Sequence, residues 1–113
     1  MKFKKGQIDG VTVKKLVKYI DERGWLSETF RHDEIDDKDV YPVMSYSSIT
    51  YPGIARGPHE HVEQTDYFVF IGPSDFKIYL WDARKDSSSY GNKMYIAGGE
   101  NNPVSVIVPP GVV

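Results

Sequence analysis

Two histidines and a carboxylate lie close together in the sequence and could form a chemical site. His59 and His61 stand two residues apart, and Asp66 follows five residues later at the start of an apolar run. In a β-strand, residues i and i+2 point to the same face, so both imidazoles are predicted to project together. Two histidines and a carboxylate on adjacent strands can form a facial metal site. A histidine can equally be a hydrogen-bonded structural residue, and the residues alone leave both interpretations open.

The segments that must position these residues have the composition of β-strands. Fifteen of the 113 residues are aromatic, and ten Gly and seven Pro interrupt the chain. Aromatic and β-branched residues favour pleated, half-buried surfaces, whereas Gly and Pro favour turns. Short strands at such spacing predict an all-β sandwich or barrel. We expect strands at residues 43–50, 66–71, 76–81, 93–97 and 104–108.

Two local predictions follow from the spacing of these segments. Only four residues, including Gly72 and Pro73, separate segment 66–71 from segment 76–81, so the two are predicted to pair as a hairpin. Segment 13–21 has apolar residues at helical spacing, but Gly10 and Gly24 also allow two short strands around a turn. We predict strands there.

The types of the side chains predict which residues lie in the core and which are exposed to solvent. The aromatic residues of the apolar runs are expected in the core or lining a barrel: Tyr67, Phe68, Phe70, Phe76, Tyr79 and Trp81. Segment 32–39 is acidic with one apolar residue, and it is predicted to be a solvated loop with His32 exposed.

Charge and composition exclude several classes of function. Fourteen Lys and Arg against sixteen Asp and Glu give a formal net charge of −2, without the basic excess that a phosphate-backbone binder needs. The absence of cysteine excludes disulfides, thiolate metal sites and thiol nucleophiles, and fits a reducing compartment. No apolar run approaches the about 20 residues of a membrane helix, and no signal peptide is evident. We therefore expect a cytoplasmic protein that binds neither nucleic acid nor membranes.

The spacing around the histidines resembles the first motif of the cupin superfamily. Gly53, His59, His61, Asp66 and Gly72 occupy its places, although Asp stands where Glu is usual and the last gap is one residue short. The second cupin motif resembles 109–113, where the chain ends one residue before the fourth ligand position. The resemblance predicts a jelly-roll β-barrel, incomplete as given. It predicts a single domain over 1–113, with N-terminal strands in 1–50, a barrel core in 51–113 and C-terminal strands missing.

A more specific resemblance covers most of the chain. Residues 21–31, with the sequence DERGWLSETFR, and residues 53–59, with the sequence GIARGPH, are similar to the dTDP-4-dehydrorhamnose 3,5-epimerases. The blocks at 81–84, 89–91 and 108–111 fall in the order of that family's later landmarks. This resemblance implies an isomerase of the cupin fold that acts on a dTDP-linked 4-keto-6-deoxyhexose in polysaccharide or lipopolysaccharide biosynthesis. It also implies a homodimer.

The resemblance implies proton chemistry without a metal or other cofactor. His59 matches the base that removes a proton alpha to the 4-keto group, and nearby donors must stabilise the resulting enolate. Arg23 and Arg56 match residues that hold the diphosphate, for which planar guanidinium groups are suited. Glu28 and Phe30 match residues near the nucleotide base, and His61 is expected to contact the substrate.

Several departures from the family pattern leave alternatives open. Asp66 replaces a lysine that assists the oxyanion, and His61 stands where Gln is usual. The family's acid tyrosine and the aspartate that orients the base would lie beyond Val113. One alternative is a metal-dependent cupin enzyme with His59, His61 and Asp66 as ligands of a divalent metal. Another is a non-catalytic module that binds a sugar nucleotide.

Overall fold

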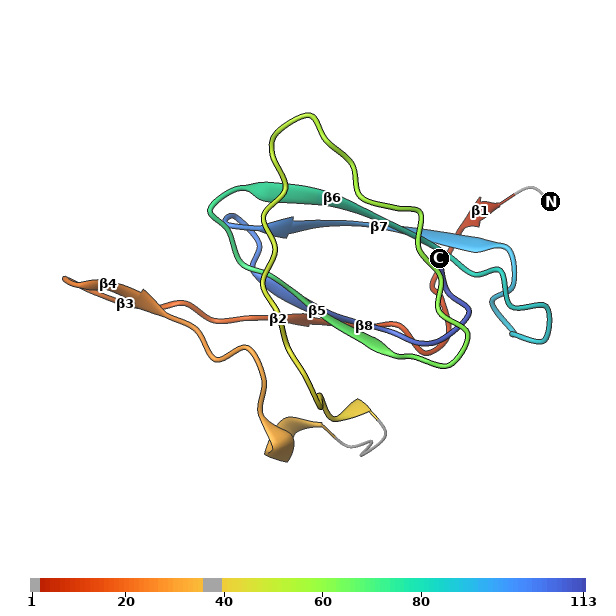
Figure 1. Cartoon of the computed structure of the whole chain (residues 1–113), viewed down its shortest axis with the longest axis horizontal. Helices are drawn as coiled ribbons and strands as arrows, with labels where there is room; N and C mark the ends of the chain where they lie inside the picture. Colours follow the sequence, from red (N-terminus) through yellow and green to blue (C-terminus); the bar gives the residue numbers. More distant parts are fainter. Residues whose placement is uncertain (1–2, 36–39) are drawn as a thin grey trace.

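A computed structural model of the chain describes residues 3–35 and 40–113. Two three-stranded β-sheets lie face to face, and a two-stranded hairpin projects beyond them (Figure 1). The regular elements of the described residues are β1 (Lys4–Lys5), β2 (Thr12–Lys15), β3 (Tyr19–Asp21), β4 (Gly24–Leu26), the 3₁₀ helix η1 (His32–Glu34), β5 (Asp66–Phe70), β6 (Asp75–Trp81), β7 (Asn92–Gly99) and β8 (Val104–Val108). The all-β prediction is confirmed, and the described strands form an open sandwich.

The strand order brings together segments that are far apart in sequence. One sheet has the order β1–β7–β6, and the other has the order β2–β8–β5. The predicted hairpin between 66–71 and 76–81 is wrong, because β5 pairs with β8 and β6 pairs with β7. The Gly72-Pro73 connection instead carries the chain from one sheet to the other. Phe70 and Leu80 can then face the same core from opposite sheets.

The core lies between the two sheets, and β8 is its central strand. Val104, Val106 and Ser105 are all buried, so β8 is covered on both faces. This explains why Ser105 is the only polar residue among its five, since a strand buried on both faces does not need to alternate between polar and apolar residues. The buried cluster consists of Ile8, Val11, Leu80, Val104, Val106, Val108 and Val112, with Phe70, Ile78, Met94 and Ile96 packed against it.

The aromatic side chains divide between the two faces of the sheets. Phe70 packs against the core as predicted. Tyr79 was also expected in the core or lining a barrel, but it is 61% exposed on the outer face of β6, where it contacts the exposed Tyr95 of β7 with ring centroids 5.3 Å apart. The period of two in β6 explains this, because Ile78 and Leu80 take the inner positions.

Three further predictions have different outcomes. Segment 13–21 contains strands as predicted, but β2 pairs with β8 and β3 pairs with β4, so the two do not pair with each other. In segment 32–39, residues 32–34 form η1, whereas 36–39 lie outside the described residues. The strand predicted at 43–50 is wrong: the segment has no regular structure, and Val43 is fully exposed. β-propensity alone does not form a strand where no neighbouring strand supplies hydrogen bonds.

Within 3–35 and 40–113, no helix is long and apolar enough to cross a membrane.

Candidate functional site

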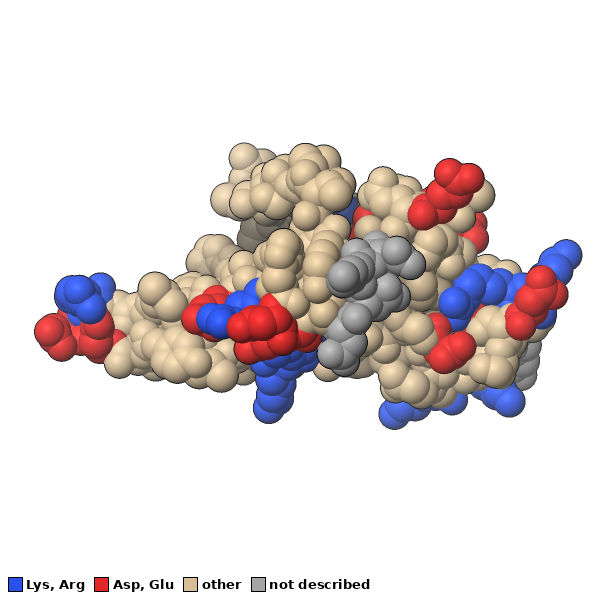
Figure 2. Space-filling model, turned by 90° about the horizontal axis from the view of Figure 1, so that it is seen from below, with Lys and Arg blue, Asp and Glu red and all other residues tan. Residues whose placement is uncertain are grey.

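Arg23 lies at the tip of the projecting hairpin. The turn between β3 and β4 places it two residues after Asp21, whose carboxylate accepts hydrogen bonds from the Arg23 backbone N at 2.8 Å and from Nη2 at 2.6 Å. The side-chain hydrogen bond to Asp21 raises the pKa of Arg23 above its ordinary value. The Arg23 side chain is nevertheless 84% exposed, and Figure 2 shows acidic and basic groups side by side at this end of the molecule. Arg23 Nε also donates to the Asp21 carboxylate at 3.2 Å, so the exposed guanidinium reaches solvent while paired with this carboxylate.

Glu28 and Phe30 follow the hairpin and lie against the outer face of the β2–β8–β5 sheet. Phe30 makes an edge contact with Tyr67 of β5, with ring centroids 5.9 Å apart. The Tyr67 hydroxyl donates a hydrogen bond to the Thr29 carbonyl at 3.2 Å. The Glu28 carboxylate accepts from Arg31 Nη1 at 3.3 Å. Tyr67 and Phe30 therefore hold this segment on the sheet, and Glu28 remains at its solvent side.

The two histidines do not share a strand, contrary to the prediction. Residues 53–65 have no regular structure, so the alternation of a strand does not apply to His59 and His61. Gly57 has φ of +117°, a backbone conformation that side-chain-bearing residues rarely adopt, and Pro58 has no N–H to donate. The His59 imidazole folds back against Gly57, where an added Cβ would lie 3.5 Å from its Cδ2.

His61 and Asp66 are brought together. His61 Nε2 lies 3.1 Å from Asp66 Oδ2, and the other carboxylate oxygen of Asp66 accepts a hydrogen bond from Gln64 Nε2 at 2.6 Å. The Gly111 backbone N donates to the His61 carbonyl at 2.9 Å. The segments that resemble the two cupin motifs therefore meet. An open surface hollow is lined by His61, Val62, Glu63 and Gln64.

Arg56 is held by its own segment. Its Nε donates to Thr50 Oγ1 and its Nη2 donates to the Ile49 carbonyl, both at 2.6 Å. Three sets of contacts therefore hold the predicted site residues separately: Arg23 on Asp21, Arg56 on 49–50, and His61 on Asp66. Among the described residues, no group of three or more His, Asp or Glu side chains converges as metal ligands, so His59, His61 and Asp66 do not form a ligand set in this arrangement.

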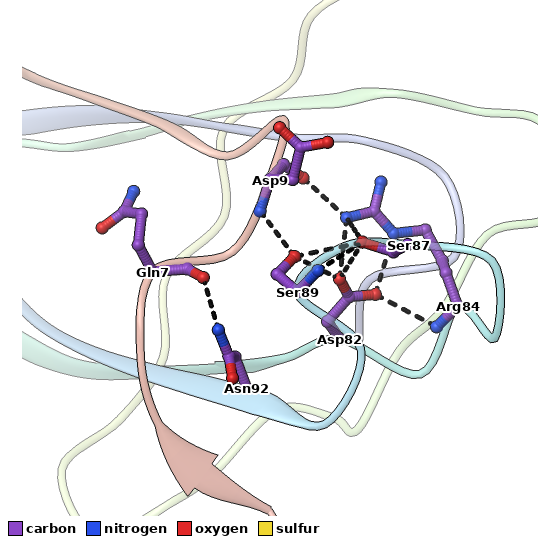
Figure 3. A network of polar contacts seen from close by, with 7 residues as sticks. All are labelled: Gln7, Asp9, Asp82, Arg84, Ser87, Ser89 and Asn92. Carbon is purple, nitrogen blue, oxygen red and sulfur yellow. Dashed lines mark hydrogen bonds and ion pairs between the residues drawn. The ribbon is translucent and has the colours of Figure 1, made fainter.

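A buried polar network lies at the end of β6, and the sequence motifs indicated it only as a family landmark. Asp82 is fully buried, and its carboxylate accepts from Arg84 Nε at 2.8 Å and from the Ser87 and Ser89 hydroxyls at 2.6 Å each (Figure 3). Burial acts to raise the pKa of Asp82, but the hydrogen bonds from Arg84, Ser87 and Ser89 outweigh it and hold the pKa well below its ordinary value. In the sequence, the signal for this network was Asp82 itself, a charged residue directly after the apolar segment 76–81.

This network joins the N-terminal segment to the loop between β6 and β7. Arg84 Nη2 donates to the Asp9 carbonyl at 2.6 Å, and the Asp9 backbone N donates to Ser89 Oγ at 2.7 Å. With these partners Asp82 has no free hydrogen-bonding capacity for a ligand. Its role is to fix the chain around the core.

Comparison with known proteins now places the chain. The family model for dTDP-4-dehydrorhamnose 3,5-epimerase matches residues 5–113. The chain belongs to this family. It is 37% identical over 105 residues to the spore coat polysaccharide biosynthesis protein SpsL of Bacillus subtilis, covering 93% of this chain and 68% of that protein. It is 38% identical over 103 residues to the "Probable low-salt glycan biosynthesis epimerase Agl13" of Haloferax volcanii, covering 90% of this chain and 65% of that protein.

Solved structures of epimerases and isomerases share the fold. The crystal structure of dTDP-4-dehydrorhamnose 3,5-epimerase from Elizabethkingia anophelis matches with a TM-score of 0.65 at 18% identity, over 99% of this chain and 64% of that one. A dTDP sugar isomerase from Desulfovibrio desulfuricans matches with a TM-score of 0.53 at 14% identity, over 93% of this chain and 66% of that one. The chain thus spans about two thirds of the length of these relatives. The cupin-like fold and the family predicted from the sequence are confirmed.

Proposed function

We propose that the protein epimerises or isomerises a dTDP-linked 4-keto-6-deoxyhexose. The observation that carries this proposal is the family match over residues 5–113, which includes the Arg56-Gly57-Pro58-His59 block. Proteins named for polysaccharide and glycan biosynthesis at 37% and 38% identity support a role in making such polymers. The exposed Arg23 at the hairpin tip supports recognition of an anionic substrate group.

In the proposed reaction, His59 removes the proton from the carbon alpha to the C4 carbonyl. The electron pair of that C–H bond forms the C=C bond of an enolate, and negative charge develops on the C4 oxygen. The acid tyrosine that the family resemblance implies would then donate a proton to the same carbon from the opposite face, which inverts its configuration and discharges the enolate. Donors near the C4 oxygen must stabilise the charge. His61 is expected to contact the substrate, with its Nε2 facing Asp66 Oδ2 at 3.1 Å.

Binding energy would come from the remaining predicted residues. Arg23 and Arg56 would bind the diphosphate, because guanidinium groups form paired hydrogen bonds with phosphate oxygens. Glu28 and Phe30 would lie near the nucleotide base.

We further propose a cytoplasmic homodimer, since a second subunit would cover exposed hairpin side chains such as Ile20 and Leu26, which are 78% and 63% exposed. Light scattering on the purified protein tests the dimer.

Solvent exchange tests the reaction directly. The protein is incubated with a dTDP-4-keto-6-deoxyhexose in D₂O, and proton NMR follows loss of the signals at C3 and C5. We expect exchange in the natural protein, and a His59→Asn rate lower by about 10²- to 10⁴-fold, as for loss of a general base. Lys77→Gln is the control, because Lys77 is an exposed residue of β6 and is not one of the predicted site residues. Full exchange in His59→Asn would overturn the assignment of the base.

The same preparation separates the two alternatives. Binding of dTDP without any exchange would identify a non-catalytic sugar-nucleotide module. Stoichiometric Fe, Mn, Ni or Zn by elemental analysis would instead favour the metal-dependent alternative. The observation that favours keeping this alternative is the 3.1 Å approach of His61 to Asp66, two of its three ligands.

A further inference from the structure

The hairpin of β3 and β4 projects from the sandwich with its apolar side chains exposed. Every residue of both strands is exposed, including Ile20 at 78% and Trp25 at 50%. Figure 1 shows it extending past the end of both sheets. Burial in the core therefore does not hold the hairpin in place. Within one subunit, contacts at the base of the hairpin join it to the sandwich.

Lys18 makes those contacts. It lies in the connection between β2 and β3, and its ammonium Nζ stands 4.5 Å from the centroid of the Trp25 ring on β4. The same Nζ donates a hydrogen bond to the Glu100 carbonyl at 3.1 Å, in the turn between β7 and β8. One side chain thus contacts both the hairpin and the sandwich. A cation over an indole ring is attracted by the negative face of the ring.

The turn that Lys18 contacts is itself well fixed. The Asp75 carboxylate accepts hydrogen bonds from the Asn101 backbone N at 3.0 Å and from Asn101 Nδ2 at 2.6 Å. These hydrogen bonds, with a smaller contribution from the Lys18 charge, lower the pKa of Asp75 and favour the anionic carboxylate that accepts from Asn101. The Leu16 backbone N donates to the Pro103 carbonyl at 2.8 Å, which ties the chain to β8 two residues before Lys18.

We propose that Lys18 is a positioning residue that clamps the β3–β4 hairpin onto the β7–β8 turn and thereby sets where Arg23 lies for the substrate diphosphate. The proposal rests on the proposed function for the role of Arg23, but not for the clamp. Lys18 acts through Trp25 and the hairpin strands, since Arg23 stands at the opposite end of the hairpin. No contact between Lys18 and the substrate is needed.

Trp25 reports the clamp without any substrate. The chain has two tryptophans, so a Trp81→Phe background leaves Trp25 as the only fluorophore of this type. In this background, Lys18→Ala is expected to lower the steady-state anisotropy of Trp25 and raise its acrylamide quenching constant. Lys18→Arg retains a cation and donors, and should restore both values. Lys15→Ala, which removes an exposed lysine at the end of β2, is the control and should leave both unchanged. Unchanged Trp25 signals in Lys18→Ala would overturn the clamp.

A double-mutant cycle with dTDP tests the link to Arg23. Calorimetric titration of the purified protein with dTDP should show about three- to ten-fold weaker binding for Lys18→Ala, as for loss of one exposed cation–π contact and one hydrogen bond. The effect of Lys18→Ala on dTDP binding should disappear in an Arg23→Met background, because Lys18 then has no Arg23 guanidinium to position against the diphosphate. In turnover, KM should rise with little change in kcat.

The outcomes separate failure of the clamp from failure of the proposed function. If Arg23→Met binds dTDP as well as the natural protein, the proposed role of Arg23 is wrong and the positioning of Arg23 falls with it, whereas the Trp25 signals still decide the clamp. If Lys18→Ala weakens dTDP binding equally with and without Arg23, Lys18 contacts the ligand directly and the positioning role is wrong. A fall in kcat for Lys18→Ala that is equally large with and without Arg23 would also overturn the positioning role.

Discussion

Asp82 shows how one carboxylate can be buried at the cost of a set of dedicated partners. Its oxygens accept from Arg84, Ser87 and Ser89, and two of these residues, Arg84 and Ser89, also bind the backbone of Asp9. A buried charge without such partners would be strongly destabilising. The chain places all three donors within seven residues of Asp82, so a short loop satisfies the charge. This loop fixes the exit of β6 and the entry of β7.

Removal of the Asp82 carboxylate should destabilise the protein and flatten its response to acid. We expect Asp82→Ala to lower the free energy of unfolding by about 3 kcal/mol, since it leaves the hydrogen-bond donors of Arg84 without their acceptor. Because the folded pKa is lowered, the stability from this carboxylate is fully present above the ordinary pKa of 3.8 and is lost as the pH falls below it. Asp82→Asn should therefore lose less stability than the natural protein between pH 4 and about pH 2.

Urea unfolding at several pH values measures both effects, with Asp86→Asn in the neighbouring exposed loop as the control. An acid dependence in Asp82→Asn equal to that of the natural protein would show that other carboxylates dominate it.

At the scale of elements, local sequence predicted the strands better than their pairing. The apolar runs at 66–71, 76–81 and 104–108 all form strands, because their composition suits a buried sheet. The short Gly72-Pro73 connection suggested a hairpin, but the pairing is decided by which faces can be buried together across the whole fold. Strand 43–50 failed for the same reason, because its Ser, Tyr and β-branched residues have the propensity for a strand but no neighbouring strand pairs with it. Pairing is a non-local property that propensity does not contain.

For the site residues, too, contacts between sequence neighbours differ from contacts between residues far apart in the sequence. His61 and Asp66, two of the three residues in the alternative metal site, lie 3.1 Å apart, and their separation of five residues makes this contact a local one. The facing of His59 and His61 depended on a strand that did not form. The hydrogen bonds from Lys18 to Glu100 and from Asp9 to Ser89 join residues 82 and 80 positions apart, and no local pattern predicts them.

The central strand β8 should carry much of the stability of the sandwich. Val106 has no exposed surface, and it pairs with Val13 of β2 on one side and Phe68 of β5 on the other. Val106→Ala removes two buried methyl groups and leaves a cavity, so we expect a loss of about 2 kcal/mol in the free energy of unfolding. Val62→Ala changes the same atoms at a side chain that is 90% exposed, and should stay within about 0.5 kcal/mol of the natural protein. Equal losses in the two variants would contradict the core position of β8.

At the scale of the whole molecule, the sandwich and the segment that carries the histidines differ in how they are held. The strands of the two sheets enclose the core, whereas residues 43–65 run outside the sheets, as the yellow-green trace of Figure 1 shows. Arg56 is held within this segment by residues 49 and 50, and His61 is tied to Gly111 by one backbone hydrogen bond. The proposed function requires Arg56 and His59 to reach a substrate whose diphosphate is also held by Arg23. Substrate binding should therefore order this segment.

Hydrogen exchange can measure that ordering. Amides of exposed, irregular backbone open with little free-energy cost, so those of 43–65 should exchange much faster than those of β8 in the free protein. When dTDP is present at 100 times its Kd, binding to the folded state contributes about 2.7 kcal/mol, so protection in segments that form the site can rise by up to about 100-fold. We expect this rise around Arg56 and in the hairpin around Arg23, measured by mass spectrometry of peptides from 43–65 and 19–26. In the control, a chloride salt replaces dTDP at equal ionic strength. If dTDP binds and protects only the hairpin peptides, Arg56 does not hold the diphosphate, and the nucleotide site would lie with Arg23 alone.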